Sequence, residues 1–456
     1  MSDDTGVVDV VVLGLGPGGE AAAAKLAGTG LSVVGVDQRL VGGECPYYGC
    51  VPSKMMIRAA DLLEEARRVP GMAGDSTVTP EWSPVADRIR AEATDDWDDT
   101  VAVERLQDAG VRFVRGHGWL TGDRTVRVGD EEFTARKGVL LNTGTEPAVP
   151  PVGGLADTPY WTNRDAVRLT ELPAALAVIG GGAIGAELAQ LFARFGVRVT
   201  VLEVADRLLP PEEPEAGRLL GDVFTREGIR VMTGVHIESV RYADGQFAIA
   251  LGDETVTCDK LLVAAGRRPN LSEIGLESVG QDPHAKALDT DDRMRVGGAD
   301  GLWAIGDITG KGAFTHMSMY QSGIAVRDIL GEDGPAADYR AVPRVTFTDP
   351  EVGAVGMTEQ QARDAGLRVR VGVTALPEST RGWIHKAGND GLIKLVEDAD
   401  RGVLVGASTI GPSGGEMLAM LTTAVHAEVP VTTLQAMIYA YPTFHRAIEA
   451  ALGKLD

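Results

Sequence analysis

The sequence predicts an α/β protein with two βαβ units and a separate α+β domain at its C-terminal end. The chain has 456 residues, which is enough for two to four domains. Two apolar, β-branched runs are each followed by a glycine-rich turn, a helical pattern and a second strand pattern. Such continuous apolar runs are typical of strands buried on both faces of a parallel sheet. From about residue 338 the pattern no longer repeats this unit, which indicates the separate domain.

The first unit is predicted to contain a strand, a glycine-rich turn, a helix and a second strand, at residues 7–13, 14–19, about 20–29 and 31–36. Its turn has the spacing of dinucleotide-binding sites, with Gly14, Gly16 and Gly19. Glycines at these positions let backbone N–H groups and the start of the helix approach a pyrophosphate. Asp37 ends the second strand, 23 residues after the first glycine, where an acid can accept hydrogen bonds from a ribose.

The same layout returns later in the chain, at residues 175–179, 180–185, 186–195 and 197–202. The second turn contains Gly180, Gly182 and Gly185, and Glu203 ends its second strand. A single glycine triplet is a frequent false positive. Two complete units, each followed by an acid at the right distance, indicate two dinucleotide sites.

Two cysteines follow the first βαβ unit, in the run from Gly42 to Lys54. Cys45 and Cys50 are five residues apart, which in an ideal helix separates their Cα atoms by roughly 8–9 Å. A disulfide needs about 4.4–6.8 Å, so the segment must kink if the pair bridges. Pro46 and Gly49 make a kink possible, and a helix start favours the thiolate. We therefore predict a redox-active pair; the alternative is two inert buried thiols.

Composition excludes several classes of function. A formal net charge of −22 argues against nucleic acid and anionic membranes as partners. The N-terminus has no signal-peptide pattern, and no apolar run approaches the ~20 residues of a membrane span. With three cysteines in all, the third being a lone Cys258, the chain is expected in the reducing cytoplasm and without a zinc site. The acidic run at residues 95–99 is expected to be a solvated surface.

Further motifs lie in a fixed order along nearly the whole chain: Thr143-Gly144, Ala265-Gly266-Arg267, Gly306-Asp307 and Phe347-Thr348-Asp349-Pro350-Glu351. Together with the two glycine turns and the cysteine motif ending Pro52-Ser53-Lys54, they resemble the flavin-dependent pyridine nucleotide–disulfide oxidoreductases. The resemblance implies Rossmann-type FAD and NAD(P) domains, a dimerisation domain and a homodimer whose active site uses both subunits. The expected boundaries are 1–150 and 271–337 for the FAD domain, 151–270 for the NAD(P) domain and 338–456 for the dimerisation domain.

The resemblance also implies roles for particular residues. Asp307 would hold the ribityl chain of FAD, and a helix starting near Thr315 would direct its positive end toward the flavin. The other FAD or NAD(P) contacts are expected at Gly43, Thr143, Gly144, Gly266, Arg267 and Gly306. Glu203 suits a free ribose 2′-hydroxyl and repels a 2′-phosphate, so we expect NADH rather than NADPH. Arg207 is close in sequence, and its positive charge would weaken this preference. Lys54 and Glu187 match the ion pair beside the flavin, whereas Glu44 departs from the threonine that is usual there.

The terminal motif departs from the family pattern more strongly. Tyr441 takes the position of the histidine that protonates the leaving thiol, and Arg446 takes that of its glutamate. A tyrosine with a pKa of ~10 is a poorer acid–base group at neutral pH than histidine at ~6.5. His445 is the nearest replacement: on a helix after Pro442 it would point about 40° beyond the face of Tyr441. A structural role for His445 is the alternative. Mercuric reductases share a tyrosine near this point, but their terminal cysteine pair is missing here.

The expected enzyme passes electrons from NADH through FAD to the Cys45–Cys50 disulfide. By resemblance, Cys50 is the thiolate next to the flavin and Cys45 is the thiol that exchanges with substrate. The acceptor would be a small disulfide or a soft metal ion. The missing histidine motivates a second hypothesis, in which reduced flavin passes electrons directly to quinones or oxygen without the cysteines. A third, a non-catalytic subunit docked on a larger complex, has little support because the chain has no lipoyl domain.

Overall fold

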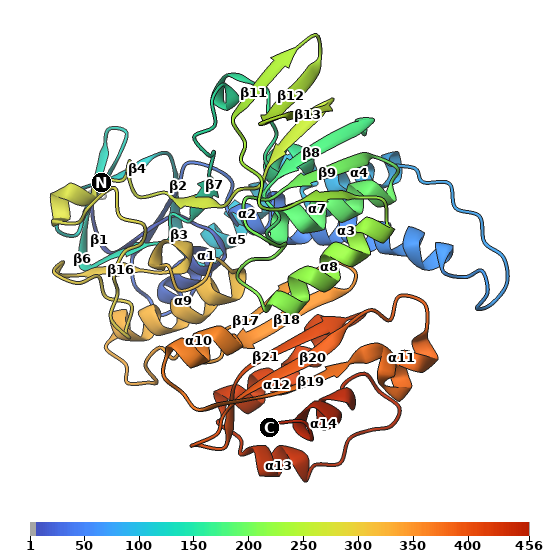
Figure 1. Ribbon diagram of the computed structural model, residues 1–456. Coiled ribbons are helices and arrows are strands. Elements are labelled where there is room, and N and C mark those ends of the chain that lie inside the picture. The colour runs from blue at the N-terminus through green and yellow to red at the C-terminus, as the bar shows by residue number, and fades with distance from the viewer. Residues whose placement is uncertain (1–5, 456) are drawn as a thin grey trace. The chain divides into compact units, whose positions relative to one another are not determined.

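The computed structural model describes residues 6–455 (Figure 1). The chain forms two compact units. The first unit comprises Met1–Pro52, Arg88–Pro147 and Arg267–Tyr339, and the second comprises Ser53–Asp87, Ala148–Gly266 and Arg340–Asp456. Among the described residues, no helix is long and apolar enough to cross a membrane.

The first unit is built on a seven-stranded sheet in the order β3-β2-β1-β6-β5-β4, with β16 paired to β6. Strands β3, β2, β1, β6 and β16 pair in parallel, whereas β4 and β5 form an antiparallel extension of β6. The strands are β1 (Val7–Leu13), β2 (Val33–Asp37), β3 (Val111–Arg115), β4 (Gly118–Gly122), β5 (Thr125–Val128), β6 (Glu131–Leu141) and β16 (Leu302–Ala304). Residues Val10–Val12 are fully buried, as expected of a central parallel strand.

Helices α1 (Pro17–Ala27) and α9 (Thr315–Leu330) contact each other beside this sheet. Helix α1 begins three residues earlier than the sequence predicts, because Pro17 occupies the first turn, where its missing N–H costs nothing. The remaining elements of the unit are α2 (Glu44–Tyr47), α5 (Thr100–Asp108), the π-helix η1 (Ile89–Ala93), the short turns η2 (Asp95–Trp97), η4 (Leu276–Val279) and η5 (Gly306–Thr309), and the antiparallel pair β7 (Thr145–Pro147) and β15 (Arg267–Pro269).

The second unit contains a parallel four-stranded sheet in the order β10-β9-β8-β14 and an antiparallel sheet in the order β11-β12-β13. Their strands are β8 (Ala175–Ile179), β9 (Arg198–Leu202), β10 (Arg230–Met232), β11 (Ser239–Ala243), β12 (Gln246–Leu251), β13 (Glu254–Cys258) and β14 (Lys260–Val263). The helices and turns are α3 (Cys50–Arg67, which begins in the first unit), α4 (Ser83–Arg88), η3 (Leu155–Asp157), α6 (Asn163–Ala166), α7 (Ala183–Arg194) and α8 (Pro214–Arg226).

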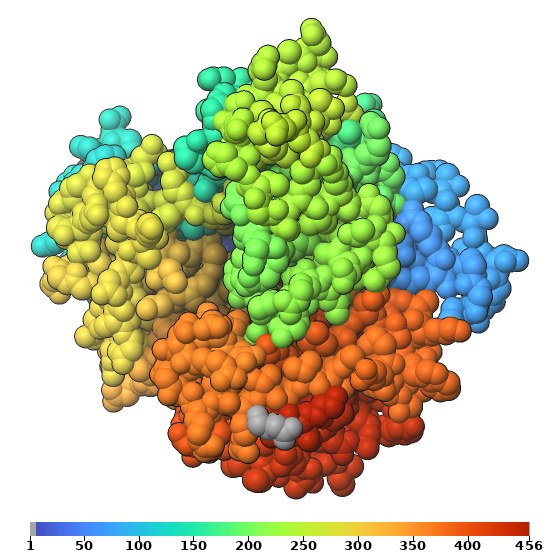
Figure 2. All heavy atoms as spheres, in the orientation of Figure 1, coloured from blue at the N-terminus to red at the C-terminus, as the bar shows by residue number. Residues whose placement is uncertain are grey.

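Residues 340–455 of the second unit form the separate domain, an antiparallel sheet in the order β17-β18-β21-β20-β19. Its strands are β17 (Pro343–Thr346), β18 (Glu351–Gly356), β19 (Val369–Ala375), β20 (Leu392–Asp398) and β21 (Val403–Gly411). Helix α12 (Gly414–His426) contacts β18 and β21; the other helices and turns are α10 (Glu359–Asp364), η6 (Leu376–Glu378), α11 (Thr380–His385), α13 (Val431–Gln435) and α14 (Ala447–Leu452). Figure 2 shows these residues, in orange and red, as a continuous surface.

The observed architecture confirms the predicted fold class, with two parallel sheets of the nucleotide-binding type and an α+β domain. One local expectation is wrong. Residues 442–446 are not helical, and α14 begins only at Ala447. The helical geometry that would have placed His445 about 40° from Tyr441 therefore does not apply.

Candidate active site

The two cysteines lie at the junction of two helices in the first unit. Cys45 is the second residue of α2 and Cys50 is the first residue of α3. Both are free thiols, Cys45 partly buried and Cys50 exposed. The hydrogen bond with the Cys50 thiol, followed by burial, raises the pKa of Cys45 well above its usual range. Cys45 therefore holds its proton in the dithiol and needs a base before it can attack a substrate.

Helix α9 begins beside this pair. The Sγ atom of Cys50 lies 3.5 Å from Oγ1 of Thr315, the first residue of α9. A helix N-terminus carries partial positive charge and stabilises a nearby anion. His316 follows, and its ring stacks on Phe314 with centroids 5.1 Å apart. The arrangement thus places Cys50 where a thiolate would be favoured.

The first glycine turn has the geometry of a phosphate-binding turn. Gly14 has a φ of 94°, and a Cβ there or on Gly19 would collide with neighbouring backbone. Gly16 is the N-cap of the eleven-residue helix α1 and has no side chain to cap its first N–H groups. Gly43, before the cysteine motif, approaches this turn so closely that a Cβ would lie 3.0 Å from Gly16 Cα. The cysteine motif and the phosphate-binding turn are therefore in contact.

Asp37 lies at the end of β2, as the sequence predicts. Its Oδ2 atom accepts a hydrogen bond from the N–H of Leu15 at 2.8 Å, and Oδ1 accepts one from Arg39 at 2.7 Å. Burial raises the pKa of this carboxyl above its usual value. The carboxylate is thus fixed at the mouth of the first turn, where a ribose would lie.

Asp307 belongs to a chain of polar contacts that includes Glu44. Thr145 Oγ1 donates to Asp307 Oδ2 at 2.7 Å, and the guanidinium of Arg267 donates to Thr145 Oγ1 at 2.6 Å. Arg267 Nη2 also lies 3.3 Å from Glu44 Oε2. Burial raises the pKa of Asp307, whereas Thr145 and Arg267 lower it. Glu44, which had no evident partner in the sequence, is therefore paired.

Thr143 and Gly144 form a loop that Asn270 holds in place. Thr143 Oγ1 donates to the carbonyl of Asn270 at 2.8 Å, and the N–H of Asn270 donates to the carbonyl of Gly144 at 2.9 Å. Sequence reasoning missed the residue before this loop. Asn142 lies against Gly14 and Gly306 and accepts a hydrogen bond from Ser318 of α9 at 3.0 Å. Its position directly before Thr143-Gly144 was the available signal.

The second glycine turn, in the second unit, repeats the first. Gly180 has a φ of 107°, Gly182 is the N-cap of α7, and a Cβ on Gly185 would collide with the Gly180 carbonyl. Glu203 Oε2 accepts a hydrogen bond from the N–H of Gly181 at 2.6 Å, in the way that Asp37 binds Leu15. Its Oε1 atom accepts from Ala205 at 2.7 Å. Gly266 has a φ of 113° at the end of this segment.

Lys54 and Glu187 form an ion pair in the second unit, with Nζ 2.6 Å from Oε2. Glu187 is buried, and its Oε1 atom accepts the N–H of Phe347 at 2.8 Å. The Lys54 ammonium also lies 4.6 Å from the centre of the Phe347 ring. The pair therefore joins α3, α7 and the segment after β17; its role beside a flavin stays a prediction.

The terminal residues are not brought together as a pair. Tyr441 is 66% exposed, and the Arg446 guanidinium lies 5.5 Å from the centre of its ring. The His445 ring is instead 6.3 Å from that of Tyr439. Within the described part of one chain, Tyr441 therefore has a cationic neighbour, Arg446, and His445 has an aromatic one, Tyr439.

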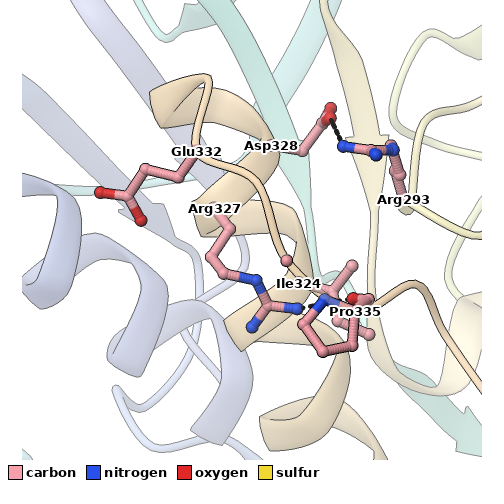
Figure 3. A pocket seen from close by; sticks show the side chains of 7 residues that line it. Arg293, Ile324, Arg327, Asp328, Glu332 and Pro335 are labelled. Atoms are coloured by element: carbon pink, nitrogen blue, oxygen red, sulfur yellow. Dashed lines mark hydrogen bonds and ion pairs between the residues drawn. The ribbon is translucent and has the colours of Figure 1, made fainter.

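A surface hollow lies at the other end of α9 from Thr315 (Figure 3). Its two arginines are engaged: Arg327 Nη2 donates to the Pro335 carbonyl at 2.8 Å, and Arg293 lies 3.7 Å from Asp328. This hollow takes no part in the cysteine site. Among residues 6–455, no group of three or more His, Cys, Asp or Glu side chains is placed to hold a metal ion.

Comparison with known proteins agrees with this geometry. Residues 8–322 match the family model of the pyridine nucleotide-disulphide oxidoreductases, and residues 342–452 match the dimerisation domain of that family. The chain belongs to this family. Members are FAD-dependent enzymes linked to NAD(P)H, so the predicted family, enzyme class and flavoprotein character are confirmed. The dimerisation domain supports a homodimer.

Relatives of several kinds are similar to this oxidoreductase. A dihydrolipoyl dehydrogenase of Halobacterium salinarum is 34% identical, covering 97% of this chain and 95% of that protein. A mercuric reductase of Staphylococcus aureus is 30% identical, covering 99% of this chain and 83% of that protein. Among solved structures, the HOCl-induced flavoprotein disulfide reductase RclA from Escherichia coli has a TM-score of 0.85 at 26% identity, covering 98% of this chain and 100% of the other.

The residues of the first unit fit the FAD that the family requires. The uncapped start of α1 suits a pyrophosphate, and the Asp37 carboxylate suits a ribose. Asp307 is bonded to Thr145 and belongs to the turn η5, which packs against α9. This oxidoreductase therefore has the donor set for the cofactor, and family membership favours the disulfide route over direct transfer from flavin to quinones.

Proposed function

We propose that this oxidoreductase uses NADH to reduce a small disulfide or a thiophilic metal ion through the Cys45–Cys50 pair. The contact between the two thiols, with Cys50 beside the start of α9, is the observation that carries the proposal. The relatives named mercuric reductase, and the solved Cu(II) complex of RclA, support a metal acceptor. The relatives named dihydrolipoyl dehydrogenase support a disulfide.

The proposed residue roles follow the geometry. FAD, when bound, supplies the two-electron chemistry that links a nicotinamide to a disulfide. Cys45 attacks one sulfur of the acceptor and forms a mixed disulfide, and the acceptor's first thiol leaves with a proton. Cys50 then displaces the second thiol and restores the Cys45–Cys50 disulfide, which two electrons and two protons return to the dithiol.

Cys45 needs a base, because its proton is held by the neighbouring thiol. We propose that Tyr441 or His445 of the second copy in the homodimer serves here. Tyr441 is the more exposed of the two, so it is the more accessible to another subunit. Lys54, paired with Glu187, would stabilise negative charge on the reduced flavin.

NADH is the proposed donor because the Glu203 carboxylate stands at the mouth of the second turn. A second negative group, the 2′-phosphate of NADPH, would be repelled there. Arg207 is already engaged, since Nη1 pairs with Asp206 at 2.9 Å and Nη2 donates to the Pro210 carbonyl at 2.9 Å.

We propose that the protein is located in the cytoplasm. We also propose the domain boundaries that the sequence predicts: 1–150 with 271–337 for the FAD domain, 151–270 for the NAD(P) domain and 338–456 for the dimerisation domain.

The test measures NADH oxidation by the holoenzyme with low-molecular-weight disulfides, Hg(II) in excess thiol, and quinones. Cys45→Ser and Cys50→Ser should abolish turnover of disulfides or Hg(II). Cys258→Ala is the matched control, since this buried cysteine belongs to the second unit and is far from the pair in sequence. Turnover of quinones alone, at a rate that Cys45→Ser leaves unchanged, would instead support the flavin-direct reaction. A kcat/KM ratio favouring NADPH would contradict the choice of donor.

A further inference from the structure

Three consecutive residues of the first unit adopt a left-handed conformation. Asp95, Asp96 and Trp97 have φ angles of 47°, 55° and 59°. For residues with a side chain this conformation is unfavourable, because Cβ lies too close to the following carbonyl oxygen. The segment directly follows the π-helix η1 and the buried Thr94. Strained backbone persists only where its surroundings hold it, and single π-helical turns in α-helices are frequent at functional sites.

This segment, with Asp98 and Asp99, contacts the backbone on both sides of Cys45, at Val41 and at Tyr47; we call residues 95–99 the strap. Trp97 Nε1 donates a hydrogen bond to the carbonyl of Tyr47 at 3.1 Å. Asp99 Oδ2 accepts the N–H of Val41 at 2.6 Å. The sequence had suggested a solvated acidic run, but Asp99 is buried and paired with Arg115 at 2.5 Å, so that expectation is wrong for this residue.

The contacts of the strap stabilise the short helix α2, which carries Cys45. With four residues, α2 is far too short to be stable alone. Tyr47 is its last residue, so its carbonyl has no partner within the helix, and the Trp97 indole satisfies it. Burial, followed by the charges of Asp99 and Glu20, raises the pKa of the Tyr47 hydroxyl to about 12, so the side chain stays neutral.

Holding the backbone on both sides of Cys45 fixes where its sulfur lies relative to Cys50. Closing a disulfide from two thiols is favoured when the thiols are held near one another, because less freedom is lost on closure. Loosening the strap would leave the dithiol more mobile and the disulfide relatively less stable. The strain in residues 95–97 would then have a function, which is to bring the Trp97 indole to the Tyr47 carbonyl.

We propose that Trp97 is a positioning residue that sets the reduction potential of the Cys45–Cys50 couple. The inference rests on the proposed function, in which this pair cycles between disulfide and dithiol. The disulfide takes up two electrons and two protons as its S–S bond breaks. In the test described next, glutathione supplies these electrons. Trp97 is proposed to act through the carbonyl of Tyr47, two residues after Cys45.

The test equilibrates the holoenzyme with glutathione buffers of graded ratio, alkylates free thiols and measures the oxidised fraction of Cys45 and Cys50 by mass spectrometry. Trp97→Phe keeps an aromatic ring but loses the N–H donor. It should lower the equilibrium constant for disulfide formation about tenfold, which is about 30 mV for a two-electron couple. Trp119→Phe, on β4 and 40% exposed, is the control and should leave the constant unchanged.

Each outcome decides something different. If Trp97→Phe and Trp119→Phe both match the unmodified protein, the strap does not set the potential and the inference is overturned. If the unmodified protein forms no Cys45–Cys50 disulfide at any ratio, the proposed function fails and the inference fails with it. Should Trp97→Phe not fold, Asp99→Asn decides: a shift in the same direction supports the strap, and an unchanged constant overturns it.

Discussion

Glu44 and Arg267 form an ion pair, with Oε2 3.3 Å from Nη2, although they are separated by more than two hundred residues of sequence. Glu44 opens the helix that carries Cys45, and Arg267 opens β15. The pair gives the carboxylate at this position a partner. It also places that carboxylate beside Gly43, which touches the phosphate-binding turn at Gly16.

Neutralising Glu44 should therefore strengthen cofactor binding. Glu44→Gln removes a negative charge near the expected pyrophosphate and leaves the positive charge of Arg267, still bonded to Thr145, without its anionic partner. A charge about 4 Å away is worth roughly 1 kcal/mol in water, so the Kd for FAD should fall about fivefold, and by less at high salt. Flavin fluorescence quenching on titration of the apoprotein measures this. Glu146→Gln, which breaks the pair with Arg268 on the neighbouring strand, is the control; weaker binding by Glu44→Gln would contradict the expectation.

The reactivity of Cys45 should depend on Cys50. The hydrogen bond with Cys50 is the largest cause of the raised pKa of Cys45, so removing it in Cys50→Ala should lower that pKa. The rate constant for alkylation of Cys45 by iodoacetamide should then rise at a lower pH than in the reduced, unmodified protein. Mass spectrometry of the alkylated peptide gives the rate at each pH. An unshifted profile would show that burial, the second cause, dominates.

The Lys54–Glu187 pair should be strongly coupled in stability. Lys54→Met leaves the buried Glu187 carboxylate without its cation, which should lower the free energy of unfolding by about 2–4 kcal/mol. Glu187→Gln keeps an oxygen for the N–H of Phe347 and should cost less. The double variant should recover part of the loss, with a coupling energy of about 1–3 kcal/mol in denaturant unfolding. Additive effects would mean that the pair is not coupled.

The left-handed backbone of the strap should tolerate glycine and reject β-branched residues. Asp96→Gly removes the steric cost of a φ of 55° but adds chain entropy to the unfolded state, so stability should change by less than about 1 kcal/mol. Asp96→Val should cost about 2 kcal/mol or more, because a branched Cβ fits this region poorly. Thermal unfolding of the two variants tests the conformation directly; equal effects would argue against it.

The fold was predictable from the sequence where the structural signal is local. Strands β1 and β8 begin and end where their apolar runs do, because burial on both faces leaves a continuous local signal. The expected helix directly after Pro442 is wrong: a proline can open a helix but does not fix where it begins, and α14 begins only at Ala447. Asp99 looked solvated within an acidic run, and its partners Val41 and Arg115 are distant in sequence.

Residues that bind through long-range contacts were the hardest to find. The glycines, Asp37 and Asp307 were predictable because their spacing follows from backbone geometry around a phosphate. Asn142 and Trp97 act through hydrogen bonds to Ser318 and Tyr47, which no local pattern encodes. The partner of Glu44 was equally hidden, since it depends on how β15 pairs with β7.

That pairing has a further consequence. Pro147 and Arg267 are directly opposite each other in β7 and β15, so the chain leaves the first unit and returns to it at neighbouring points. A segment whose two ends meet can be removed or replaced at little cost in loop closure. The 119 residues between them, Ala148–Gly266, thus form a cassette, and an exchanged segment must keep Glu187 as the partner of Lys54. Exchanging the cassette between relatives could alter the preferred nicotinamide donor while every residue around Cys45 and Cys50 in the first unit stays as it is.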